Sequence, residues 1–80
     1  MNDLMNDKER LIWLEAEAEK AYGDMYDAPL GATATAAYSN AKEFMNDAIA
    51  LAQRLGRRED VERLEIRLAH IKSVFRSHFS

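Results

Sequence analysis

The chain has 80 residues and a mass of 9.1 kDa, with 48% hydrophobic and 31% charged residues, a formal charge of −3 and no cysteine. Such a length allows only one domain, residues 1–80, which buries only about 60–65% of the surface that its unfolded chain exposes, so its stability as a monomer is marginal. No disulfide or thiolate zinc site adds to that stability, and the acidic balance argues against general nucleic-acid binding.

The first segment predicts an amphipathic helix over residues 4–26. Its apolar residues recur at steps of three, four or seven, which places them on one face of a helix. Asn6 and Glu9 have the spacing of a capping box, and Asn2 or Asp3 is an alternative N-cap for an earlier start. Pro29 is expected to end the helix because the residue before a proline is disfavoured in helical geometry. The stripe that we expect to face the core consists of Leu4, Leu11, Leu14, Ala18, Ala21 and Met25.

The second segment predicts a helix over residues 33–55, although its start is not determined. Thr33, Thr35 and Ser39 are alternative N-caps, so residues 27–36 are either helix or loop. Farther along, two neighbouring apolar stripes together span an arc of about 160° at about 100° per residue. A helix with so wide an apolar face is contacted from two sides, and we therefore place it between the other two helices. The stripes consist of Ala37, Ala41, Phe44, Ala48, Leu51 and Leu55, and of Tyr38, Met45, Ile49 and Ala52.

The third segment predicts a helix over residues 58–78. Gly56 is a typical C-terminal stop for the preceding helix, and the short link that follows it favours an antiparallel helical hairpin. The chain is therefore expected to form an all-α, three-helix antiparallel bundle in up-down-up order, with the second helix in the centre. The seam of the third helix consists of Val61, Leu64, Leu68, Ile71 and Phe75.

No constellation of residues indicates catalysis, so we expect no enzyme activity, no catalytic residue, no cofactor and no metal. His70 and His78 lie more than two helical turns apart, too far for one chain to bring both to a single metal ion. Neither histidine follows the Glu-x-x-His pattern of di-iron bundles. The acidic run of the first helix is interpreted as a solvated face; it consists of Glu15, Glu17 and Glu19.

Charge is unevenly distributed along the chain. Residues 1–30 hold eight acids and three bases, a net charge of −5, whereas residues 57–80 hold six bases and four acids, a net charge of +2. We expect the basic end of the third helix to complement the helix dipole and the acidic surface of the first helix. The alternative is an accessory nucleic-acid-associated or regulatory protein with phosphate contacts at Arg63, Arg67, Lys72 and Arg76, although so few charges predict weak, salt-dependent binding.

Several apolar residues of the first helix fall outside its core stripe. Trp13 lies about 200° from Leu11 around the helix, and either the chain between the first two helices folds back over it or it forms an interface. We favour the interface, because aromatic residues and methionine are enriched where proteins meet. The candidate interaction surface consists of Met5, Ile12, Trp13, Tyr22 and Tyr26.

These features together predict a small, non-enzymatic protein-interaction module. We expect a homodimer, with an unidentified protein as a further possible partner. Nucleic acid is not expected as a partner. Neither a signal-peptide pattern nor an apolar run of about 20 residues is present, so a membrane location is not expected and the cytoplasm is the expected compartment.

Overall fold

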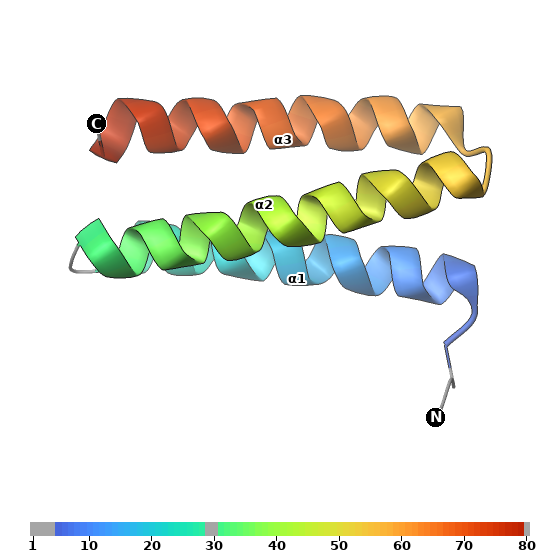
Figure 1. The fold of residues 1–80 in the computed structure, drawn as a ribbon, viewed down its shortest axis with the longest axis horizontal. Helices are drawn as coiled ribbons and strands as arrows, with labels where there is room; N and C mark the ends of the chain where they lie inside the picture. Colours follow the sequence, from blue (N-terminus) through green and yellow to red (C-terminus); the bar gives the residue numbers. More distant parts are fainter. Residues whose placement is uncertain (1–4, 29–30, 80) are drawn as a thin grey trace.

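Three antiparallel α-helices make up the computed structural model, which describes residues 5–28 and 31–79 (Figure 1). They are α1 (Asp7–Asp27), α2 (Gly31–Arg54) and α3 (Arg58–Phe79). Because successive helices reverse direction, α1 and α3 run parallel to each other (Figure 1). The predicted all-α class and up-down-up order are confirmed.

The ends of α1 follow the local signals in the sequence. The Glu9 backbone N–H donates to Asn6 Oδ1 at 2.8 Å, and the Asn6 backbone N–H donates to Glu9 Oε1 at 3.1 Å, so the capping box is present. The helix ends at Asp27, and Ala28 has the extended conformation (φ −68°, ψ 127°) that is favoured before a proline. Asn2, Asp3, Leu4 and Pro29 themselves lie outside the described residues.

The undetermined segment between the first two helices is mostly helical. Since α2 begins at Gly31, the residues considered as N-caps, Thr33, Thr35 and Ser39, all lie inside the helix. A threonine is neutral to unfavourable within a helix, so local propensity points to a later start. Ala34 and Ala37 are buried against Met25 of α1, and this packing accounts for the earlier start of α2 at Gly31.

A Schellman motif ends α2. Gly56 has a positive φ of 71°, which a residue with a side chain adopts only at a cost. The Gly56 N–H donates to the Gln53 carbonyl at 3.1 Å, and the Arg57 N–H donates to the Ala52 carbonyl at 2.9 Å. The chain reverses there, and α3 begins at Arg58.

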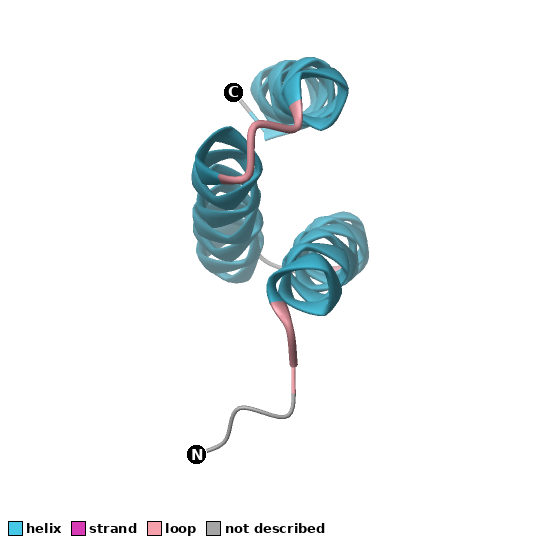
Figure 2. Cartoon of the chain, turned by 90° about the vertical axis from the view of Figure 1, so that its right-hand side faces the viewer, coloured by secondary structure: helices cyan, strands magenta, loops and turns pink. Residues whose placement is uncertain are grey.

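The helices form two layers, with α2 in one layer and α1 and α3 in the other. Seen end-on, α2 lies beside both neighbours, whereas α1 and α3 stand farther from each other than either does from α2 (Figure 2). The shortest extent of the Cα positions, 13 Å, matches two helices packed at the usual axial spacing of about 8–10 Å. The predicted central position of α2 is confirmed.

The buried core follows the predicted stripes closely. One departure is Leu55, which is 36% exposed because α2 ends one residue before it. Alanine dominates the buried positions of α2, and small side chains let its neighbours approach closely. The buried residues are Leu11, Leu14, Ala18, Ala21 and Met25 in α1; Ala34, Ala37, Ala41, Met45, Ala48, Ile49, Leu51 and Ala52 in α2; and Leu64, Leu68 and Ile71 in α3.

Replacing Gly56 or Gly23 by alanine is expected to change stability in opposite directions. Gly56→Ala should lower the free energy of unfolding by about 1–2 kcal/mol, because alanine is strained at positive φ. Gly23→Ala should raise it by about 0.5–1 kcal/mol, because Gly23 lies inside α1 and an added Cβ meets nothing within 4 Å. Urea unfolding in dilute solution measures both, and a Gly56→Ala variant that is as stable as wild type or more stable would contradict the assigned end of α2.

Candidate functional site

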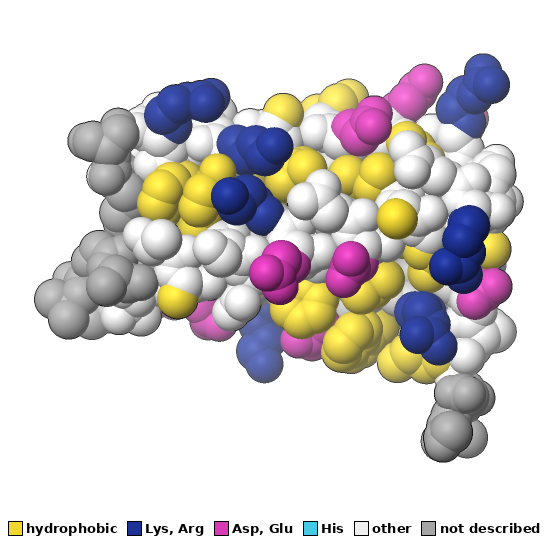
Figure 3. All heavy atoms as spheres, viewed as in Figure 1, with side chains coloured by type: hydrophobic (Ala, Val, Ile, Leu, Met, Phe, Trp, Pro, Cys, Tyr) yellow, Lys and Arg dark blue, Asp and Glu magenta, His cyan; other side chains and the backbone are white. Residues whose placement is uncertain are grey.

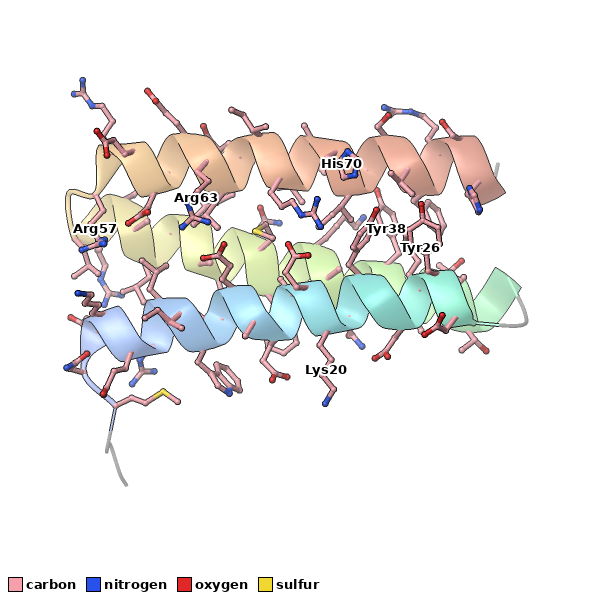
Figure 4. The ribbon with its side chains drawn as sticks, turned by 180° about the vertical axis from the view of Figure 1, so that it is seen from behind. Lys20, Tyr26, Tyr38, Arg57, Arg63 and His70 are labelled. Carbon is pink, nitrogen blue, oxygen red and sulfur yellow. The ribbon has the colours of Figure 1, made fainter. Side chains whose placement is uncertain are left out.

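The open side between α1 and α3 is bridged by side chains rather than by backbone contact. Glu15 meets Arg63, Glu19 meets Arg67 and Tyr22 meets His70, each pair 48 residues apart. A constant separation means that the parallel helices stay in register over these turns. In Figure 4, seen from behind, side chains of α3, Arg63 among them, extend toward α1. We call these three pairs the α1–α3 ladder.

Two ion pairs form the first rungs of the ladder. Arg67 donates to Glu19 through Nε and Nη2, both at 2.7 Å, and Arg63 contacts both Glu15 and Asp60, donating from Nη2 to each at 3.1 Å. The hydrogen bond from Arg67 lowers the pKa of Glu19, and in return the pKa of Arg67 is raised. The predicted complementarity between the acidic first helix and the basic third helix is confirmed by these contacts.

Aromatic side chains and histidines continue this side of the molecule toward the C-terminus. Tyr22 Oη lies 3.4 Å from His70 Nε2, and the Tyr22 ring is edge-on to Tyr26 at 5.4 Å between centroids. Tyr26 is in turn edge-on to His78 at 5.3 Å. Burial is the main cause of the raised pKa of Tyr22.

A shallow groove of about 570 Å³ lies along the ladder, lined by Glu15, Glu19, Arg63, Ile66, Arg67 and His70.

The five residues predicted as one interaction surface divide between two places. Tyr22 and Tyr26 contact the histidines of α3, and Tyr22 is half-buried against the core. Trp13 lies nine residues from Tyr22, which is about half a turn around the helix after two full turns. The structure therefore does not bring Tyr22 and Trp13 together.

The other three residues mark the outer edge of α1, away from α3. The exposed fractions are 40% for Met5, 61% for Ile12 and 42% for Trp13. Figure 3 shows hydrophobic side chains gathered along this edge, and in Figure 4 Lys20 points away from α3 on the same side. We call Ile12, Trp13 and the exposed Ala16, together with Met5 just before the N-cap Asn6, the outer face of α1.

Trp13 is partly anchored by α2. Its ring is edge-on to Phe44, with centroids 5.8 Å apart and planes at 88°. Phe44 packs against the main core, so one edge of the indole is held while the remainder faces outward. Sequence reasoning assigned Phe44 to the core and missed this contact, although its place at the edge of the wide apolar face of α2 is consistent with it.

The four basic residues considered for phosphate binding are not gathered into one patch. Arg63 and Arg67 hold carboxylates in the α1–α3 ladder. Lys72 lines a separate shallow hollow that also includes Lys42 and Glu43 of α2. Arg76 lies in the last turn of α3, where a positive charge favours the helix dipole.

Within residues 5–28 and 31–79, no group of three or more His, Asp or Glu side chains is placed to hold a metal ion. None of the helices, over the described residues, has the length and hydropathy needed to cross a membrane. Comparison of the chain with family models, curated proteins and solved structures finds nothing similar.

The Glu19–Arg67 pair predicts a pH-dependent contribution to stability. Because the pKa of Glu19 lies below its ordinary value of 4.5 in the folded chain, the contribution is present above that pH and is lost as the pH falls through the folded pKa. Glu19→Gln should lower the free energy of unfolding by about 0.5–1 kcal/mol at pH 7, and the difference from wild type should shrink as the pH falls below 4.5. Urea unfolding across that range is the measurement.

Glu17→Gln is the matched control for this prediction. Glu17 lies on the same helix, and its side chain forms no ion pair or hydrogen bond with residues 5–28 or 31–79. Its replacement should therefore change stability little at any pH. A pH-independent effect of Glu19→Gln, equal to that of the control, would contradict the role given to the ion pair.

Proposed function

We propose that this protein is a non-enzymatic helical interaction module that associates with a second copy of itself through the outer face of α1. The observation that carries the proposal is the exposure of Ile12 and Trp13, at 61% and 42%, side by side on a helix whose other face is already buried. Contiguous apolar side chains on a surface are typical of protein interaction sites.

The anchoring of Trp13 supports this proposal energetically. Ordering a mobile side chain in an interface costs about 0.5–1.5 kcal/mol. The edge-on contact with Phe44 already restricts the indole before any partner arrives, so less conformational entropy remains to be lost. A preordered aromatic side chain is the kind of residue that contributes most to binding.

The size of the outer face indicates reversible association. A helix of 21 residues is about 31 Å long and about 10 Å wide, which gives a face of about 300 Å². Stable interfaces bury about 800 Å² on each partner. We therefore expect dissociation constants in the micromolar range or weaker, and another protein with an apolar helix would compete for the same surface.

The chemistry of the α1–α3 groove supports a binding role over a catalytic one. Its ionisable groups, Glu15 with Arg63 and Glu19 with Arg67, pair with one another across the helices. The pKa of Glu19 is lowered, whereas a general acid working near neutral pH needs a raised pKa. The same pairs reduce the positive charge available for phosphate, so the nucleic-acid alternative gains no support from them.

Two exposed isoleucines provide a matched test of self-association. Ile12→Lys on α1 should weaken association at least tenfold, because it places a charge in the interface. Ile66→Lys on α3, where the native side chain is 72% exposed, should leave association unchanged. Sedimentation equilibrium from about 10 µM to about 1 mM measures both, with circular dichroism confirming that each variant is folded.

The outcomes of this test are distinct. A wild-type chain that stays monomeric over the whole concentration range overturns the proposal. A dimer weakened equally by both substitutions, or by Ile66→Lys alone, assigns association to another surface. Trp13→Ala should also weaken the dimer, and a shift of its indole fluorescence with concentration reports directly on burial in the wild type.

A further inference from the structure

We propose that α3 is a detachable element, which opens from α2 as one unit while α1 and α2 stay paired as a helical hairpin. The open form uncovers apolar side chains of α2 that are hidden in the closed form. This opening takes place within a single chain and does not depend on self-association. Three features of the closed molecule support it: the division of the core among the helices, the contacts that join α3 to α1, and the structure of the turn before α3.

Of the three helices, α3 contributes least to the core. Within the described residues, α1 has five buried side chains, α2 has eight and α3 has three. The closest packing is between α1 and α2, whereas α3 packs on α2 and stands apart from α1 (Figure 2). Because burial of apolar surface is the dominant favourable term in folding, α3 is the helix whose release costs least. Its buried side chains are Leu64, Leu68 and Ile71.

The two apolar stripes of α2 face different helices. Phe44 of the first stripe has an edge-on contact with Trp13 of α1. Tyr38 of the second stripe stacks on Phe75 of α3, with ring centroids 3.9 Å apart and planes at 4°. Release of α3 therefore uncovers side chains of the second stripe and leaves the packing of the first stripe on α1 in place. The second stripe consists of Tyr38, Met45, Ile49 and Ala52.

The α1–α3 ladder joins α3 to α1 through contacts that water can replace. The ion pairs of Arg63 and Arg67 are partly exposed, and exposed pairs contribute little to stability. Arg63 also has a partner within α3, since its Nη2 donates to Asp60 Oδ1 at 3.1 Å. When α3 leaves α1, Arg63 loses Glu15 but retains Asp60, so the first pair of the ladder adds little to the cost of opening.

The end of α2 is kept in the open form, whereas α3 itself loses most of its structure. The N–H groups of Gly56 and Arg57 donate to carbonyls of α2, so the Schellman motif remains when α3 leaves. With 22 residues, α3 is of a length at which an isolated helix is only marginally stable in water. Its backbone amides therefore become accessible to solvent in the open form.

Hydrogen exchange of the whole chain in dilute solution tests this opening. After correction for intrinsic rates, the amides of residues 64–71 in α3 should exchange together, about tenfold or more faster than the slowest amides of α1 and α2. The reason is that α3 exchanges through its own opening, whereas α1 and α2 require unfolding of the whole chain. Equal slowest rates in the three helices would overturn the proposal, because the chain would then open as one unit.

Opposite substitutions on α1 and α3 provide a matched comparison. Gly23→Ala stabilises α1 in the closed and the open form alike, so it should slow exchange in α1 and α2 by about two- to fivefold and leave α3 unchanged. Ala69→Gly weakens α3, which is helical only in the closed form, so it should speed exchange in all three helices by a similar factor. Both positions are exposed, so each variant should keep the fold.

The pattern of changes identifies the element that opens. Slower exchange of α3 in Gly23→Ala would couple α3 to α1 and overturn the proposal. Faster exchange of α1 than of α3, unaffected by Ala69→Gly, would assign the opening to α1 and overturn it equally. A chain that stays monomeric at every concentration overturns the proposed self-association but leaves these exchange rates as expected, so the two failures are distinguishable.

Discussion

The wide apolar face of α2 is the constraint on which the rest of the structure depends. Half of the buried residues in the described part of the chain lie on this helix, more than on either neighbour, and most of these are alanine. Because α2 contacts both neighbours, α1 and α3 need no close backbone contact with each other, and the fold has two layers. The hydrophobic core therefore holds each outer helix to α2, while the spacing between the outer helices is left to longer side chains.

The α1–α3 ladder fills that spacing with polar and aromatic groups. Its ion pairs are partly exposed, and pairs of this kind contribute modestly to stability. Their larger effect is on geometry, because a bidentate contact between Arg67 and Glu19 is satisfied over a narrow range of helix positions. With its charges committed to one another on this side, the chain presents its unpaired apolar side chains on the opposite edge of α1.

Periodicity was enough to predict the helices, their order and nearly all of the core, because burial repeats along each helix at the spacing of its turns. It failed at Leu55, which lies one residue beyond the end of α2 at Arg54, and at the start of α2, where packing of Ala34 overrides the capping preference of later threonines. The ladder was predicted only as a general attraction of charges. The equal spacing of Glu15 and Glu19 on one helix and Arg63 and Arg67 on a parallel helix is a signal that finds these pairs once the helix order is known.

The placement of Tyr22 and Trp13 on different sides of α1 also follows from their separation in the sequence. The contact of Trp13 with Phe44 depends on how α2 is rotated about its own axis, which one sequence does not supply.

The constant separation of 48 residues makes the ladder sensitive to the length of α2. Since α2 runs back along α1, removing one residue from it moves the start of α3 by about 1.5 Å and slides the whole of α3 past its partners. Glu62 would then stand at the level of Glu15, where two like charges repel each other. Ile66 would stand at the level of Glu19, which would lose its cationic partner. An insertion or deletion in α2 therefore disrupts the contacts between α1 and α3, on a side of the molecule that α2 does not form. Insertions and deletions are therefore expected near the ends of the chain, while α2 keeps a fixed number of residues.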